Sequence, residues 1–286
     1  SADVVLGNRV GTYEVAATCA ECSPDAITFT AQGKLFLQVS LSTSSIKPVP
    51  FSRVVTAENQ TVITVRAFGV NGSTDTVAGY PVVLISSTSS NYGGHDHDAA
   101  RPFGGAFSGA GLAVANNTAS GLTNAQGEFF AVFASTFFGG IEVFTAGSTI
   151  DAGVAPATAT LTIKAGYFEP LDPGATFYTL DGGRQFHHGP ACTDLAIDPA
   201  CNAPDRNHYG LPSTNAAISA IAAEWLALHP DLKLEINDMS LQAGGGFDVG
   251  GNWADDIVDE FSNDTKKCNP TGHCEHRDGR QVDIQV

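Results

Sequence analysis

Short runs of alternating apolar and polar residues, separated by turn signals, constrain the fold of this chain more than any other feature. Six such runs follow one another between residues 34 and 165, and dipeptides such as Asn71-Gly72 and Gly139-Gly140 stand between them. Alternation with a period of two buries one face of a strand, and close turns favour antiparallel pairing. We therefore expect a mainly β chain built from sandwich modules. The predicted strands are LFLQVSLS, QTVITVRAFGV, YPVVLISST, EFFAVFAS, GIEVFTAGS and ATATLTIKA.

The pattern divides the 286 residues into three parts, although length alone suggests about two domains. Residues 1–33 hold three strand-like runs, DVVLG, GTYEVAAT and AITFTAQ, which are too few to enclose a core. We expect them to be the last strands of an incomplete Ig-like domain that pairs with another chain or another segment. Residues 34–165 are predicted to form an Ig-like β-sandwich, with residues 91–111 as a long loop.

Residues 166–286 are predicted to form a small, incomplete α+β domain. The run STNAAISAIAAEWLALH at 213–229 has apolar residues at helical spacing, Ser213 or Thr214 as its N-cap, and Pro230 after its end. The segments LKLEINDMSL and RQVDIQV alternate as strands. A helix beside antiparallel strands defines this class.

The six cysteines fall in three close pairs, which favours short-loop disulfides in an oxidising, extracellular compartment. A zinc site built from the CAEC segment and another pair is the alternative, but neither other pair has C-x-x-C spacing. The predicted disulfides are Cys19–Cys22, Cys192–Cys201 and Cys268–Cys274.

The charge balance restricts the partners. The formal net charge is −16 and the pI is near 4.6, which opposes nucleic-acid binding. No apolar run reaches the roughly 18 residues of a membrane helix. The first residues have no signal-peptide pattern, so we expect a mature or trimmed secreted chain. The acidic run at 255–260 is expected to be a solvated helical turn, with calcium binding as the alternative.

The segment CEHRDGRQVDI carries an H-x-x-G-x-x-x-D array formed by His276, Gly279 and Asp283. Imidazole and carboxylate are ligand types that Zn²⁺ accepts, and a catalytic zinc also needs a third protein ligand and an open position for water. Gly279 would allow a tight turn, after which Asp283 on a strand points back at the same metal. His273 stands three residues before His276.

Two resemblances follow from these residues. The segment GLTNAQGEFFAVFASTFFGGIEVFTAGS resembles the later strands of bacterial invasin/intimin-type Ig-like domains. CEHRDGRQVDI resembles the signature of zinc D-Ala-D-Ala carboxypeptidases and murein endopeptidases, and INDMSLQAGGGFDVGGNW resembles the stretch that precedes it in secreted Ig-repeat proteins. The resemblance implies that His276 and Asp283 bind zinc. It also implies a cleft that contains His208, Asp238, Ser240, Asp248 and His273.

The chain departs from that family at two points. Cys274 stands where the family has serine, and the family's third ligand lies in an H-x-H beyond the position of Val286. We therefore expect no zinc-dependent peptidase activity from the chain as given. His187, His188 and His208 are upstream candidates for the missing ligand. A solvated or locally hydrogen-bonded polar loop is the favoured interpretation of His187 and His188, whereas the two interpretations are balanced for His208.

The loop residues His95, Asp96, His97 and Asp98 form a second candidate metal site. The alternative is a polar loop in which histidine and aspartate bond one another.

These features support three functions. The first is an extracellular surface protein with an inactive murein-peptidase-like domain. The second is a full-length zinc peptidase acting on peptidoglycan peptides. The third is a structural, adhesive or filament-forming Ig-array subunit whose partners are further Ig-like domains or other chains.

Overall fold

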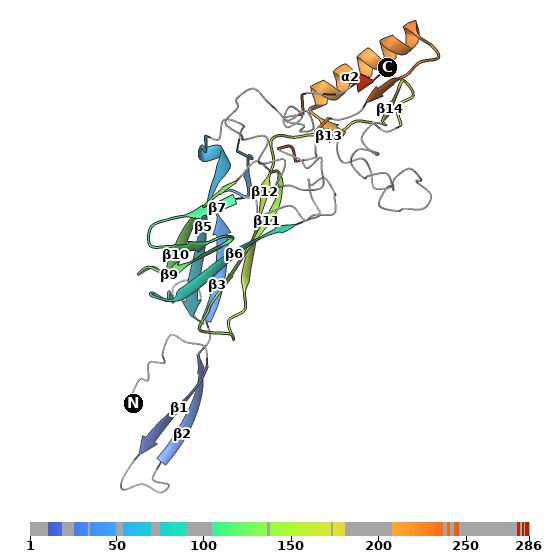
Figure 1. The fold of residues 1–286 in the computed structure, drawn as a ribbon. Coiled ribbons are helices and arrows are strands. Elements are labelled where there is room, and N and C mark those ends of the chain that lie inside the picture. The colour runs from blue at the N-terminus through green and yellow to red at the C-terminus, as the bar shows by residue number, and fades with distance from the viewer. Residues whose placement is uncertain are drawn as a thin grey trace.

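The computed structural model describes three parts of the chain in sequence order (Figure 1). The described residues are 11–18, 26–33, 35–49, 54–69, 75–89, 105–135, 138–172, 174–180, 208–236, 239–240, 243–245, 279–280, 282 and 284–285. Within them the structure is mainly β, with one α-helix, α2, and one 3-10 turn. Helix α2 is neither long nor apolar enough to cross a membrane, and it is the one α-helix among these residues.

The N-terminal part is an antiparallel hairpin of β1 (Gly11–Thr18) and β2 (Ala26–Gly33). Its register places Val15 opposite Phe29 and Ala17 opposite Ile27. The third predicted strand, DVVLG, lies outside the described residues. In Figure 1 the hairpin projects from one end of the sandwich, and one residue, Lys34, stands between β2 and β3 (Leu35–Leu41).

The middle part is a two-sheet sandwich. One sheet has the order β3-β5-β10-β7, with antiparallel pairs throughout. The other has the order β4-β12-β11-β6-β9-β8, in which only β4 and β12 run parallel. The first sheet consists of β3 (Leu35–Leu41), β5 (Gln60–Gly69), β10 (Glu128–Ser135) and β7 (Gly105–Ser108). The second consists of β4 (Ser45–Ile46), β12 (Ala157–Ile163), β11 (Gly140–Gly147), β6 (Pro81–Ser89), β9 (Thr118–Leu122) and β8 (Ala113–Ala115).

Alternating side chains from both sheets form one continuous core. Phe133 lies at its centre, with its ring centroid 5.6 Å from that of Phe107 and 5.0 Å from that of Phe144. Edge-on arrangements of this kind stabilise beyond the burial of area alone. The fully enclosed aliphatic side chains are Ile63, Val65, Leu84, Leu161 and Ile163.

All six predicted sandwich strands are present, but the predicted loop at 91–111 is too long. Residues 105–108 form β7, which pairs with β10 and places Phe107 in the core. The flanking glycines concealed this strand in the sequence. At Gly105 no Cβ fits, because it would overlap the ring of Phe133.

The C-terminal part is small and mixed. The helix α2 (Pro212–Leu228) packs by Ile218 and Ala222 against a three-stranded sheet of order β14-β16-β17. That sheet is formed by β14 (Tyr178–Leu180), β16 (Leu234–Ile236) and β17 (Ile284–Gln285), and only its second pair is antiparallel. A further pair joins β13 (Glu169–Pro170) to β15 (Tyr209–Gly210).

The predicted N-cap of this helix is wrong. Leu211 is the cap residue and makes no side-chain cap bond, while Pro212 opens the first turn. Proline suits that position because its missing N–H would have no helical acceptor there. The predicted apolar stripe is only half buried, since Ile221 and Leu228 are exposed.

Candidate functional site

Two described residues that the sequence singles out in the C-terminal part, Ser240 and Gly279, contact the segment that begins at His208. The side chain of His208 is buried, and its Nε2 lies 3.1 Å from the carbonyl oxygen of Ile236 in β16. Because a carbonyl oxygen only accepts hydrogen bonds, Nε2 is the donor, and the acceptor of the neutral ring is then Nδ1. His208 therefore links the segment before β15 to the central strand of the sheet.

The backbone of Ser240 pairs with that of Tyr209, the residue after His208. Its N–H donates to the carbonyl of Tyr209 and the Tyr209 N–H donates back, both at 3.0 Å. The Ser240 hydroxyl is fully buried and has no hydrogen-bond partner in the described structure. The predicted cleft residues His208 and Ser240 are thus brought to one place.

Gly279 of the H-x-x-G array packs against the same segment. The N–H of Leu211 donates to the Gly279 carbonyl at 2.9 Å. The φ angle of Gly279 is +70°, which favours glycine, and an added Cβ would stand 2.8 Å from the ring of Phe168. This geometry agrees with the tight turn expected of Gly279.

Strand β17 pairs Ile284 with Ile236, whose carbonyl oxygen lies next to His208. The remaining candidates lie outside the described residues and stay predictions. They are His95, Asp96, His97, Asp98, His187, His188, Asp238, Asp248, His273, His276, Asp283 and all six cysteines. Among the residues that are described, no group of three or more His, Cys, Asp or Glu side chains could hold a metal ion.

The segment that carries Ser240 continues into a contact with the sandwich. The N–H of Ala165 donates to the carbonyl of Ala243 at 2.8 Å, and Phe138 forms a β-bridge with Gly245. A Cβ on Gly139 would lie 2.5 Å from the carbonyl oxygen of Gly244 and 2.7 Å from the Cβ of Ala243. The two backbones approach so closely that only glycine fits at 139, and we call this contact the joint.

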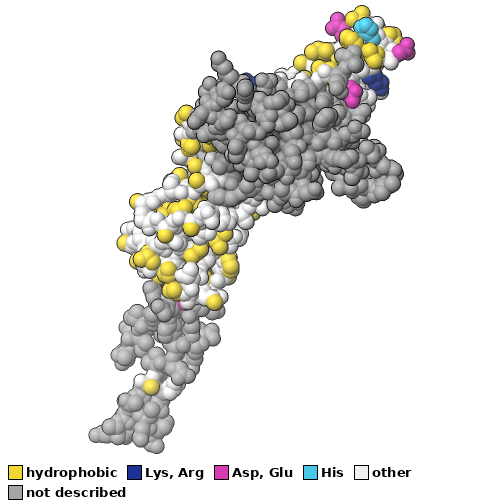
Figure 2. Space-filling view, viewed as in Figure 1, with side chains coloured by type: hydrophobic (Ala, Val, Ile, Leu, Met, Phe, Trp, Pro, Cys, Tyr) yellow, Lys and Arg dark blue, Asp and Glu magenta, His cyan; other side chains and the backbone are white. Residues whose placement is uncertain are grey.

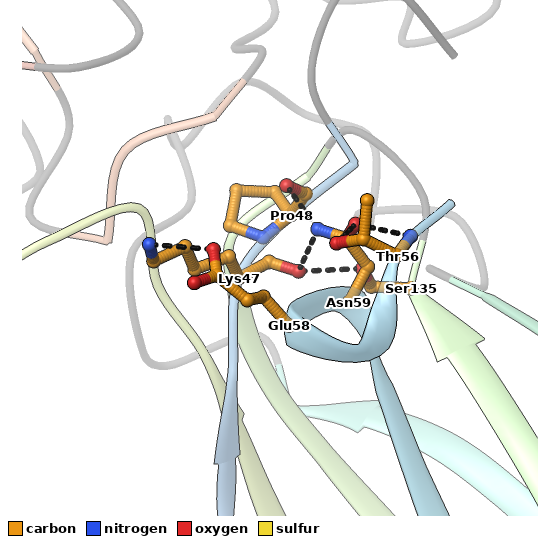
Figure 3. Close-up of polar contacts among 6 residues, drawn as sticks. All are labelled: Lys47, Pro48, Thr56, Glu58, Asn59 and Ser135. Atoms are coloured by element: carbon orange, nitrogen blue, oxygen red, sulfur yellow. Dashed lines mark hydrogen bonds and ion pairs between the residues drawn. The ribbon is translucent and has the colours of Figure 1, made fainter. Parts of the chain in front are cut away.

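A polar cluster fixes the sandwich at the same end (Figure 3). The buried Asn59 amide donates to the carbonyls of Lys47 and Pro48 at 3.2 and 3.1 Å, and its Oδ1 accepts from the N–H and the hydroxyl of Thr56, both at 2.9 Å. The hydroxyl of Ser135 donates to the Lys47 carbonyl at 2.7 Å. These bonds hold the chain after β4 in place.

An open pocket of about 390 Å³ lies next to this cluster. Its walls include Lys47, Glu58, Lys164 and the exposed Tyr167. Lys47 and Glu58 form an ion pair of 2.8 Å at the surface. Pairs this exposed contribute little to stability, so the pocket wall rests on Asn59 rather than on the ion pair.

The charge is distributed unevenly along the chain. Residues 34–165 contain six Lys and Arg and seven Asp and Glu, a net charge of −1, whereas residues 166–286 contain seven and nineteen, a net charge of −12. The sandwich surface seen in Figure 2 accordingly consists almost entirely of hydrophobic and uncharged polar side chains.

Two structural residues escaped the sequence analysis. Asn59 lies in the 3-10 turn η1 (Ala57–Asn59), for which no pattern was expected. Glu142 is fully buried in β11 and accepts hydrogen bonds from Ser86 at 2.8 Å and Thr88 at 3.2 Å. Its phase in GIEVFTAG, which matches that of Phe144, was an available signal for a carboxylate facing the core.

Comparisons with known proteins give fold similarity. No protein-family model and no curated protein matches the sequence. Parts of the chain match solved structures, among them the following three. The adhesin InvE of Yersinia pseudotuberculosis has 14% identity and a TM-score of 0.32, over 55% of this chain and 41% of that one. The D0-D1 domain of intimin has 14% identity and a TM-score of 0.29, over 54% of this chain and 64% of that one. The Escherichia coli adhesin FdeC has 13% identity and a TM-score of 0.27, over 57% of this chain and 43% of that one. The chain thus spans less than two thirds of each.

Proposed function

We propose that this chain is an extracellular structural and adhesive module, in which the sandwich holds the C-terminal part at a fixed position at a cell surface. The observation that carries the proposal is that one residue connects the hairpin to the sandwich, and that a backbone contact connects the sandwich to the C-terminal part. One residue, Lys34, separates β2 from β3, and the joint at Gly139 ties the sandwich to residues 243–245. Short connections of this kind transmit position, whereas long flexible linkers do not.

The cysteine pairs and the acidic composition support an extracellular location. Three close pairs suit an oxidising compartment, and a net charge of −16 keeps a secreted protein soluble. The near-neutral sandwich presents few charges to a neighbouring module. Further Ig-like domains and other protein chains are therefore the proposed partners.

The proposal is tested on intact cells that produce the protein. Protease treatment without lysis should release its peptides into the medium, and recovery only after lysis would contradict the surface location. Beads coated with the full chain should be retained on a cell layer more than beads coated with albumin. Equal retention of the two kinds of bead would contradict the adhesive role.

A second candidate function is metal binding by the peptidase-like C-terminal part, in a protein without peptidase activity. The observation that favours it is the convergence of His208, Ser240 and Gly279 described above. His276 and Asp283 would supply an imidazole and a carboxylate, and zinc in such a site polarises a carbonyl and activates water. Calcium at the acidic run at 255–260 is a further proposal for the same assay.

Elemental analysis separates these readings. We expect zinc to co-purify with the chain, and His276→Ala or Asp283→Asn to remove it, while His95→Ala leaves it in place. Zinc retained by the first two variants would contradict the assignment. Incubation with purified peptidoglycan should release no muropeptides, and chelator-sensitive release would show an active enzyme instead.

A further inference from the structure

We propose that β3 is a docking edge, and that it pairs antiparallel with β3 of a second copy of this chain. The starting observation is the composition of the strand. Strand β3 is LFLQVSL, seven residues without a charge, a proline or a glycine, and it forms one edge of its sheet in the described structure. Proteins normally protect a strand edge with charges, prolines or bulges, because unpaired N–H and C=O groups attract other strands.

The core is incompletely closed along this edge. The inward-facing Leu37, Val39 and Leu41 pack against the core but remain half-buried, whereas Val65 and Ile63 on the neighbouring β5 are fully buried. A strand added beside β3 would cover these aliphatic side chains as well as saturate its backbone. The other edge strands of the sandwich are shorter, namely β7 with 4 residues, β8 with 3 and β4 with 2.

The outward face of β3 also suits a partner. Phe36 is 44% exposed, and its ring stacks on that of Phe68 with centroids 5.8 Å apart. Across this surface lies a single ion pair, between Arg66 and Glu128. A partner strand with charges would leave them without counterparts, so the edge favours an uncharged strand of alternating apolar and small polar residues.

The sequence of β3 itself meets this requirement. When two copies pair antiparallel around Gln38, each of the seven residues finds a counterpart on the same face. Leu35 then lies opposite Leu41, Leu37 opposite Val39, and Gln38 opposite Gln38 of the second copy. No like charges meet, and the contact closes around a twofold axis, which limits the assembly to a dimer.

A charge exchange at the twofold position tests this pairing. The unaltered chain should sediment as a dimer of twice its 29.6 kDa at micromolar concentrations. Gln38→Lys should raise the dimer dissociation constant by about fivefold, because like charges then face each other across the axis. Gln38→Glu should raise it less, because Arg66 lies opposite position 38 on β5 and offsets part of the repulsion. An equimolar mixture of the two variants should restore the dimer, and about 1 M salt should reduce both effects.

Thr64→Lys is the matched control, since Thr64 lies on the same sheet face but on the neighbouring β5. It should leave the dimer intact. A chain that stays monomeric at every concentration would overturn the proposal, and so would a dimer that Gln38→Lys leaves unchanged or that Thr64→Lys weakens equally. Neither result would affect the proposed surface location, which the cell experiments test separately.

Discussion

Replacing Asn59 should weaken the sandwich at the end that meets the C-terminal part. Asn59→Ala removes four hydrogen bonds of the cluster in Figure 3. In this variant the carbonyl of Lys47 still accepts a hydrogen bond from Ser135, and the N–H and hydroxyl of the exposed Thr56 can bond to water instead. The carbonyl of the buried Pro48 loses its donor from Asn59.

The magnitude follows from these differences. A buried acceptor without a donor costs about 1–3 kcal/mol, and each bond that water replaces costs only a fraction of 1 kcal/mol. We expect Asn59→Ala to lower the free energy of unfolding by about 2–3 kcal/mol. Asn59→Asp should cost more at neutral pH, because a carboxylate keeps the two acceptor bonds from Thr56 but cannot donate to the carbonyls of Lys47 and Pro48.

Urea denaturation followed by far-UV circular dichroism measures this loss. Both tryptophans, Trp225 and Trp253, lie in the C-terminal part, so their fluorescence reports that part separately. Ser135→Ala is the control and should cost about 1 kcal/mol, since Asn59 still bonds the same carbonyl. A loss below about 0.5 kcal/mol for Asn59→Ala, or an Asp variant no weaker than the Ala variant, would refute the argument.

Three further predictions address the joint, the core and alkaline stability. Gly139→Ala should open the joint, because its Cβ would meet the Gly244 carbonyl at 2.5 Å, and limited proteolysis should then cleave the variant faster between the two parts. Phe133→Ala should lower the free energy of unfolding of the sandwich by about 3–5 kcal/mol in the same urea assay. A loss below about 1 kcal/mol would contradict the central place of Phe133 in the core. Burial, followed by the nearby charge of Asp151, raises the pKa of Tyr80 in the folded protein above its ordinary value of 10.0. The contribution of Tyr80 to the free energy of unfolding is therefore complete below pH 10, and it falls as the pH rises through the pKa of the folded protein. When the pH is raised from neutral to alkaline, the free energy of unfolding should therefore fall less for Tyr80→Phe than for the unaltered chain. Urea denaturation at several pH values measures this difference.

The strands of the sandwich were predictable because alternation reports burial directly. In β10 and β11 every second residue faces the core, and the sequence shows this phase clearly. Strand β7 was missed because its core contact rests on one residue, Phe107, between glycines. Short strands that tertiary contacts impose leave no periodicity to detect.

The candidate site was predictable only in part. The resemblance selected His208, Ser240 and Gly279, and the fold places their backbones together, although 38 residues lie between Ser240 and Gly279 along the chain. The joint was not predictable, because glycine in a run such as AGGGF signals a turn as readily as a close approach of two backbones. Asn59 was missed for a related reason, since a polar residue in a turn normally bonds its own loop.

The parallel pairing of β4 with β12 has a mechanical consequence. A force that pulls the hairpin away from the C-terminal part loads the sandwich from the start of β3 and from the end of β12. The bonds from the N–H of Thr162 to the carbonyl of Ser44 and from the N–H of Lys164 to the carbonyl of Ile46, both 2.9 Å, lie across that load. Because the two strands run in the same direction, the force shears both bonds together rather than breaking them one after the other. The two-residue strand β4 thereby adds to the resistance of the sandwich to tension.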